Sequence, residues 1–218
     1  MKLGVFDSGI GGEAVAAALR VSFPDAQVIT VNDRLHVPYG DRSSSEVILL
    51  TNAAIQPLLR EQCDVIILAC NTATALAIQT LRSAYPQQQF IGIEPMIKTA
   101  AARTKSGIVA VCATPATLAS ERYDQLLADY GAGIRILEPN CRDWARMIEN
   151  NLLEHQLIRQ TVTTMCDQGA DVIVLGCTHY HWIKDLIVET AGDRAVVIEP
   201  SDAIGRRVQQ LLSGEPVH

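Results

Sequence analysis

Two cysteines at equivalent places in a repeated sequence are the residues best suited to chemistry. Cys70 follows the apolar run 65–69, and Cys177 follows the matching run 172–176, so the repeat is offset by 107 residues, from residue 70 to residue 177. Each run is typical of a strand buried on both faces of a sheet. Two thiols placed in this way could bind a metal, form a redox disulfide, supply a nucleophile or move protons.

The residues around the two cysteines favour proton transfer among these four chemistries. The chain has no Cys-x-x-Cys pair, and His179 is the one additional metal ligand near either thiol in the sequence. A nucleophile needs a single thiol and a base. Proton transfer to both faces of one carbon needs two groups, one on each side, and a pseudo-symmetric cleft would present one thiol to each face of a flat carbanion.

Polar residues accompany each thiol. Asp7 and Ser8 follow a strand that we expect to neighbour the Cys70 strand, and His179 comes two residues after Cys177. A carboxylate or an imidazole can exchange a proton with a thiol. Uncharged hydrogen-bond donors could hold a substrate carboxylate and the negative charge that it gains; the candidates are Asn71, Thr72, Thr114, Thr117 and Thr178.

Alternating strand and helix patterns predict an α/β fold with parallel sheets. The repeat predicts two related domains, residues 1–95 with 199–218 and residues 96–198, with the site in the cleft between them. The two cysteines then lie at the carboxyl edges of the sheets, where ligands bind in such folds. We also predict three single helices, over 43–61, over 114–130 and from Trp182 onward. Ser43 and Glu46 form a capping box at the start of the first.

Composition narrows the class of protein further. The 218 residues carry a formal net charge of −6 and no basic run, which argues against nucleic acid as a partner. No stretch is apolar and long enough to cross a membrane, and Asp7 interrupts the first apolar segment too early for a signal peptide. We therefore expect a cytoplasmic protein, in which Cys63, Cys112 and Cys166 are small buried hydrophobes.

Four motifs give the chain a resemblance to the cofactor-independent amino-acid racemases, the glutamate racemases in particular. They are residues 6–12, 38–40, 69–73 and 176–180, in matching order and spacing. The resemblance implies two flavodoxin-like domains that close over glutamate, without pyridoxal phosphate or metal. It also implies that the protein interconverts L- and D-glutamate and supplies D-glutamate for peptidoglycan.

The resemblance also implies roles for individual residues. Cys70 and Cys177 would be the acid/base pair, with Asp7 assisting Cys70, His179 assisting Cys177, and Glu149 as a further acid near the site. The substrate-binding positions that it implies are Asp7, Ser8, Pro38, Tyr39, Gly40, Asn71, Thr72, Thr114, Thr117, Thr178 and His179. We further predict a homodimer.

Some segments depart from the family pattern, at Ala113, at His181, in the loop 32–37 and in the turn 199–202. Two alternatives therefore stay open beside glutamate racemisation. One is an aspartate or broad-specificity racemase, and the other is a non-catalytic protein that binds an amino acid. The presence of both thiols disfavours a decarboxylase that uses one cysteine.

Overall fold

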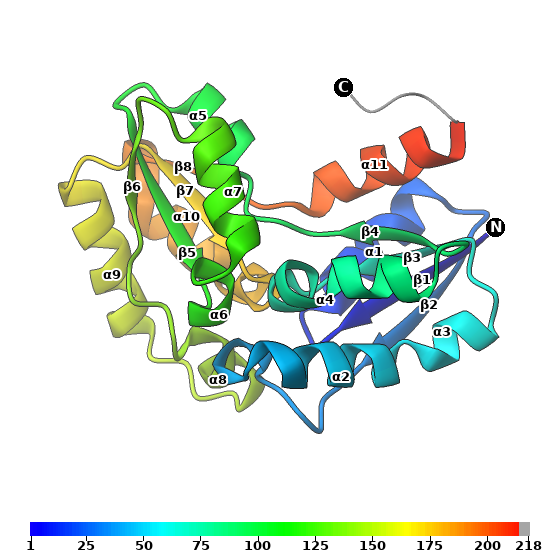
Figure 1. Ribbon diagram of the computed structural model, residues 1–218. Helices are drawn as coiled ribbons and strands as arrows, with labels where there is room; N and C mark the ends of the chain where they lie inside the picture. The colour runs from blue at the N-terminus through cyan, green and yellow to red at the C-terminus, as the bar shows by residue number, and fades with distance from the viewer. Residues whose placement is uncertain (214–218) are drawn as a thin grey trace.

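Each half of the chain folds around its own parallel sheet of four strands, as Figure 1 shows for this computed structural model, which describes residues 1–213. The first sheet has the order β2-β1-β3-β4, from β1 (Lys2–Asp7), β2 (Gln27–Asn32), β3 (Val65–Leu68) and β4 (Gln89–Gly92). The second has the order β6-β5-β7-β8, from β5 (Ile108–Ala113), β6 (Arg135–Leu137), β7 (Val172–Gly176) and β8 (Val196–Ile198).

The two sheets repeat the same topology, with β1 and β5 in equivalent central places. Leu3 of β1 lies beside Val65 of β3, and Val109 of β5 lies beside Val172 of β7, both in parallel register. All four residues of β3 and all five of β7 are buried, because helices cover both faces of each sheet. The predicted fold class, with two pseudo-symmetric flavodoxin-like halves, is confirmed.

Helices cover both faces of each sheet. The first sheet packs between α1 (Gly12–Ser22) with α11 (Ser201–Ser213) on one face and α2 (Ser44–Ala54), α3 (Gln56–Arg60) and α4 (Asn71–Ala84) on the other. On the second sheet, one face is covered by α5 (Ile97–Arg103) and α7 (Glu121–Tyr130). The other face is covered by α8 (Trp144–Glu149), α9 (His155–Asp167) and α10 (Lys184–Ala191). Shorter elements are α6 (Pro115–Leu118), η1 (Tyr39–Asp41), η2 (Thr178–Ile183) and η3 (Gly192–Arg194).

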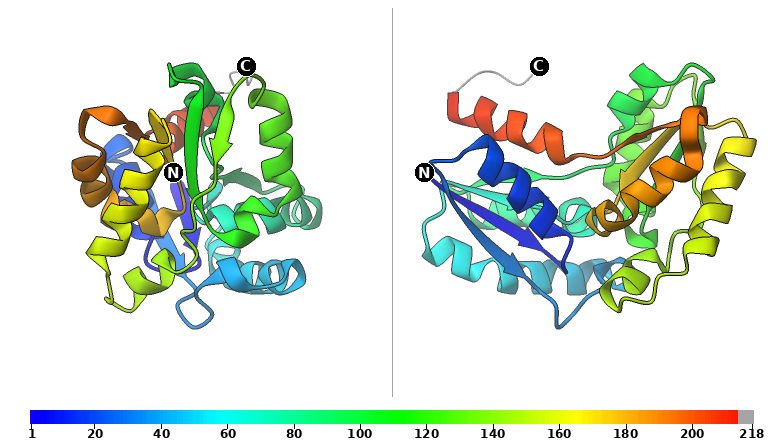
Figure 2. Two further views of the ribbon diagram at one scale, coloured as in Figure 1. Left: turned by 90° about the vertical axis from the view of Figure 1, so that its left-hand side faces the viewer. Right: turned by 180° about the vertical axis from the view of Figure 1, so that it is seen from behind.

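The chain crosses between the two halves twice, after β4 and after β8, so that α11 returns to the first sheet (Figures 1 and 2). This path agrees with the predicted order of segments, although the domain boundaries at 95/96 and 198/199 stay a prediction and residues 214–218 lie outside the described part. Within residues 1–213, no helix is both long and apolar enough to span a membrane.

Helix ends agree with the sequence prediction at one place and differ at three. Ser43 begins α2 with the predicted capping box, in which its hydroxyl accepts from the Glu46 N–H at 3.4 Å. The predicted helix 43–61 is interrupted at Ile55, two residues before Pro57, which has no N–H to donate to a continuous helix. The predicted helix 114–130 is also divided, because Ser120 caps a new helix by accepting from the Tyr123 N–H.

The third difference lies directly after Cys177. A 3₁₀ helix, η2, occupies Thr178–Ile183, and the regular helix α10 begins at Lys184 rather than at Trp182. Trp182 is about half exposed, at 53%. The tighter turn places Thr178 and His179 close behind Cys177, where both side chains are buried.

Candidate active site

Cys70 and Cys177 line one cavity between the two halves. Cys70 follows β3 and caps α4, since its sulfur accepts from the Ala73 N–H at 3.4 Å. Cys177 follows β7. The residues that line the cavity are Ser8, Pro38, Tyr39, Gly40, Cys70, Asn71, Thr72, Thr114, Ala145, Cys177 and His179. Both halves therefore contribute to one site, at the carboxyl edges of their sheets.

Cys70 is buried and lies near the carboxyl group of Asp7. Its sulfur is 3.3 Å from the hydroxyl oxygen of Ser8. Burial, followed by the charge of Asp7, raises the pKa of the Cys70 thiol to about 12, although the Ser8 hydroxyl and the Ala73 N–H partly oppose this. At neutral pH, Cys70 is therefore a protonated thiol in this state of the protein.

Asp7 connects the two halves rather than hydrogen-bonding to Cys70. Its Oδ2 accepts from the Gly9 N–H at 2.8 Å, and its Oδ1 accepts from the Thr178 hydroxyl of the second half at 2.9 Å. Burial raises the pKa of the Asp7 carboxyl above its ordinary value, against the charge of His179 and these hydrogen bonds. The group in contact with the Cys70 sulfur is Ser8, so Asp7 influences this thiol through its charge.

Cys177 begins a chain of three polar groups. Its sulfur lies 3.7 Å from Nδ1 of His179, whose Nε2 lies 2.6 Å from Oε1 of Glu149. The same carboxylate oxygen accepts from the Ile10 N–H of the first half at 2.7 Å. Cys177, His179 and Glu149 are thus joined in one line that starts at the cavity and ends at the first half.

The charges in this line support one another. Burial lowers the pKa of His179, but its hydrogen bonds with Cys177 and Glu149 outweigh burial and raise that pKa well above the ordinary value. Burial raises the pKa of Glu149, but the hydrogen bonds from His179 and Ile10 and the charges of His179 and Arg34 hold it below the ordinary value. An imidazolium paired with a carboxylate is therefore favoured beside Cys177 at neutral pH.

Three threonines form a hydroxyl cluster at the interface between the two halves, which we call the seam. The Thr72 oxygen is 2.9 Å from that of Thr114 and 3.3 Å from that of Thr117, and the last two are 3.0 Å apart. Thr72 and Thr114 line the cavity, whereas Thr117 lies behind them. Thr178 and Glu149 likewise do not line the cavity, and they contact Asp7 and His179 instead.

Asn71 is the clearest sign that a ligand belongs in the cavity. Its side chain is buried, and neither the oxygen nor the nitrogen of its amide has a hydrogen-bond partner. A buried polar group left unpaired costs about 1–3 kcal/mol. Asn71 lines the cavity, at the N-terminus of α4, so a polar ligand there would satisfy the amide.

The remaining wall comes from the turn 38–40. Tyr39 is buried, and its hydroxyl donates to Asp33 at 2.7 Å. A Cβ on Gly40 would lie 2.7 Å from the Cβ of Thr114, so the close approach of the two halves requires glycine there. Ala145 also lines the cavity. The sequence does not indicate this residue as part of the site, because an alanine carries no chemical signal and only its position on α8 brings it to the cavity.

The cavity is nearly closed. The volume open to the centre of a water-sized sphere is about 10 Å³, roughly the space of one water molecule. An amino acid can therefore reach the thiols only when the two halves move apart. The seam that must open is joined by Thr178–Asp7, Ile10–Glu149 and the threonine cluster.

This arrangement of two thiols in an inter-domain cavity agrees with what the chain resembles among known proteins. The model of the Asp/Glu/hydantoin racemase family matches residues 12–206, and the chain belongs to this family. The predicted resemblance is thereby confirmed.

Individual relatives point to one member of the family. A glutamate racemase from Herpetosiphon aurantiacus is 37% identical over 215 residues, which cover 97% of this chain and 84% of that protein. A glutamate racemase from Roseiflexus sp. is 36% identical over a match that covers 96% of this chain and 79% of that protein. Escherichia coli glutamate racemase, in complex with L-glutamate and the activator UDP-MurNAc-Ala, superposes with a TM-score of 0.87 at 26% identity, over 99% and 84% of the two chains.

Proposed function

We propose that this protein is a glutamate racemase, an isomerase that interconverts L- and D-glutamate by proton transfer between two thiols. The observation that carries the proposal is the presence of Cys70 and Cys177, from equivalent strand ends, in one inter-domain cavity. Relatives at 36% and 37% identity that are glutamate racemases support the substrate. The roles of the individual residues are part of the proposal.

In the proposed reaction, one cysteine thiolate removes the α-proton and the other thiol protonates the opposite face. The electron pair of the broken C–H bond moves to the α-carbon and its carboxylate, and the new C–H bond takes it back. Cys70 is held as a thiol, and the sulfur of Cys177 lies 3.7 Å from Nδ1 of His179, which can exchange a proton with it.

Neutral donors would hold the substrate carboxylate as negative charge develops on it. The unpaired Asn71 amide and the N-terminus of α4 face the cavity, and Thr72 and Thr114 add hydroxyls that can rotate. Such preoriented dipoles stabilise a carbanion in a water-excluded site. The deduced binding residues need no cofactor to act in this way.

Purified protein without pyridoxal phosphate or added metal should racemise glutamate. In D₂O, the α-proton signal of L-glutamate should disappear in the NMR spectrum while D-glutamate accumulates, and dialysis against EDTA should leave the rate unchanged. Absence of α-proton exchange from both enantiomers would instead favour the non-catalytic binding protein. Loss of the rate after EDTA treatment would contradict the cofactor-independent mechanism.

Glutamate should be preferred over aspartate, since the motifs at both cysteines and the relatives above are of the glutamate type. Chiral chromatography of product from each amino acid gives kcat/KM for the two substrates. A larger kcat/KM for aspartate would show that the departures near the loop 32–37 have changed specificity. The same assay run with both substrates at several concentrations separates an effect on KM from one on kcat.

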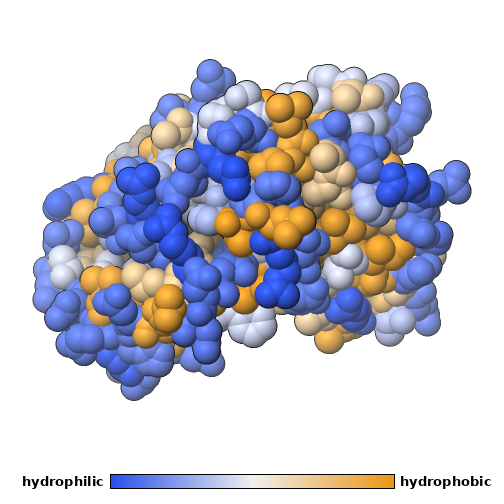
Figure 3. Space-filling view, turned by 90° about the horizontal axis from the view of Figure 1, so that it is seen from below, coloured by the Kyte–Doolittle hydropathy of each residue, from blue (hydrophilic) through white to orange (hydrophobic). Residues whose placement is uncertain are grey.

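The biological setting follows from the proposed activity. D-Glutamate made in the cytoplasm would supply peptidoglycan synthesis, in the role that the family resemblance implies. A homodimer stays a prediction, since a single chain does not test it. Leu49 of α2 is 69% exposed. Figure 3 views the molecule from the side of α2 and shows separate hydrophobic patches among hydrophilic surface.

A further inference from the structure

A second and larger cavity lies outside the active site at the seam between the halves. Its volume is about 430 Å³, and it is lined by Arg34, Val37, Pro38, Arg146, Glu149 and Asn150. Pro38 also lines the inner cavity that holds the two thiols, and Glu149 hydrogen-bonds to His179 of that cavity. We call this space the outer chamber. It adjoins the active site and is of a size that suits a small ligand.

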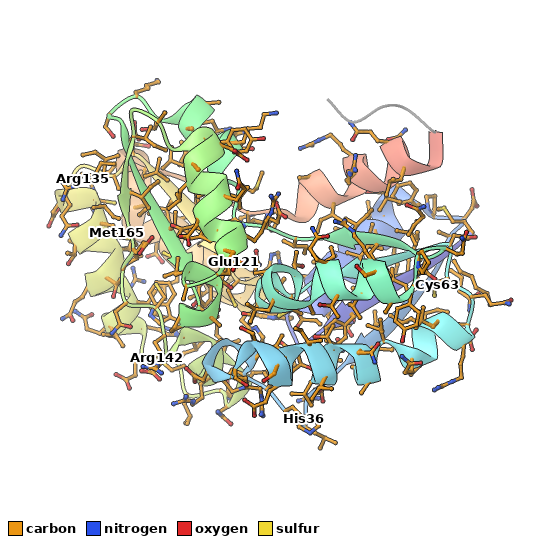
Figure 4. All side chains as sticks on the ribbon, in the orientation of Figure 1. His36, Cys63, Glu121, Arg135, Arg142 and Met165 are labelled. Carbon is orange, nitrogen blue, oxygen red and sulfur yellow. The ribbon has the colours of Figure 1, made fainter. Side chains whose placement is uncertain are left out.

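The two halves contribute to the outer chamber from opposite sides. Arg34 and Pro38 belong to the loop between β2 and η1, and Arg146 and Glu149 belong to α8. Figure 4 shows this loop and the segment before α8 on the same side of the molecule, where His36 and Arg142 are labelled. Any movement that opens the seam there opens the outer chamber and the inner cavity together.

The loop between β2 and η1 is held by hydrogen bonds that leave the Arg34 guanidinium able to bind a ligand. Asp33 accepts hydrogen bonds from the Tyr39 hydroxyl at 2.7 Å and lies 2.8 Å from Nδ1 of His36. These contacts fix the residues on both sides of Arg34. Within residues 1–213, the exposed Arg34 guanidinium forms no hydrogen bond of its own, whereas Arg146 is paired with Asp41 at 2.7 Å.

Within the described part of the chain, the outer chamber offers one unpaired guanidinium and one carboxylate oxygen to a ligand such as glutamate. Two guanidinium groups face it, from Arg34 and Arg146, together with the Glu149 carboxylate. The hydrogen bonds from Ile10 and His179 both go to Oε1 of Glu149, which leaves Oε2 for another donor. A carboxylate of glutamate can pair with the Arg34 guanidinium and its ammonium group with Oε2 of Glu149, whereas Arg146 is already paired with Asp41 and Asp143.

We propose that the outer chamber binds glutamate before the halves separate, with Arg34 as the residue that captures a substrate carboxylate. This proposal rests on the proposed function, because it assigns the substrate of the inner site to the outer one. Arg34 is a positioning residue in this scheme and takes no part in proton transfer. Its effect is electrostatic, so it raises the rate of capture and weakens as salt screens the charges.

Arg34→Gln should lower kcat/KM for glutamate about tenfold at roughly 0.01 M ionic strength, and the loss should fall on kcat/KM rather than on kcat. At about 1 M salt, where the Debye length is about 3 Å, the variant and the wild type should converge. Arg34→Lys should recover most of the loss. Arg20→Gln is the matched control, because it removes the same charge from an exposed place on α1.

A merely structural role for Arg34 would lower kcat, or lower kcat/KM equally at both salt concentrations, and either result overturns the proposal. So does an effect no larger than that of Arg20→Gln. Inactive wild-type protein would refute the proposed function instead. In that case, equilibrium dialysis with radiolabelled glutamate at low salt tests the outer chamber without turnover. Weaker retention by Arg34→Gln than by wild type would support binding there, and equal retention would reject it.

Discussion

Replacement of either Cys70 or Cys177 by alanine is expected to abolish racemisation. Both thiols line one cavity, and reprotonation on the face opposite to proton removal needs the thiol that has been lost. The loss of a general acid or base typically costs about 10²- to 10⁴-fold in rate. Chiral analysis of the product from each enantiomer measures this loss, and we expect both variants to fall by at least that factor.

The two variants should differ in which enantiomer still exchanges its α-proton. The family resemblance implies that Cys177 would act on L-glutamate and Cys70 on D-glutamate. Cys177→Ala should therefore exchange only the α-proton of D-glutamate in D₂O, and Cys70→Ala only that of L-glutamate, as followed by NMR. Exchange by Cys70→Ala is the better supported of the two, since His179 and Glu149 remain beside Cys177.

Cys166→Ala provides the control, because Cys166 is a buried cysteine of the second half that does not line the cavity. It should keep the full rate of racemisation. If Cys70→Ala and Cys177→Ala also racemise at near wild-type rates, proton transfer between two thiols is excluded. Melting temperatures of all three variants establish that they are folded.

The repeat around the two cysteines was the strongest sequence signal, for a physical reason. A strand buried on both faces must be a continuous apolar run, and parallel strands bring their carboxyl ends to one edge of a sheet. The runs 65–69 and 172–176 therefore locate Cys70 and Cys177 before any contact is known. The cysteines Cys63, Cys112 and Cys166 are buried, as predicted.

Contacts across the seam had no comparable signal. Neither periodicity nor spacing indicates that Ile10 donates to Glu149, or that Thr178 donates to Asp7, because these pairs depend on how the two halves dock. Family resemblance supplied Glu149 as an acid near the site without giving its partner. The break at Ser120 has a local reason. Serine occurs both at helix N-caps and within longer helices, so Ser120 alone does not predict that a new helix begins there.

Substitution of Gly9 by alanine should remove most of the activity while leaving each half folded. A Cβ on Gly9 would overlap Oε1 of Glu149 and lie 2.6 Å from Nε2 of His179. Either the halves stay apart or the Glu149–His179 pair is displaced. A misplacement of about 1 Å at a catalytic group can cost about 10²-fold, so we expect kcat/KM to fall by roughly this factor.

Gly205→Ala is the matched control, since it makes the same chemical change within α11, where the nearest atom to the new Cβ is Oγ of Ser22 at 3.3 Å. Alanine is favoured over glycine in a helix by about 1 kcal/mol, so this variant should be fully active and at least as stable as the wild type. For Gly9→Ala, the radius of gyration from X-ray scattering should increase if the halves stay apart. Full activity in Gly9→Ala would mean that Glu149 and His179 can move without loss, and the line from Cys177 through His179 to Glu149 would then have no part in proton transfer.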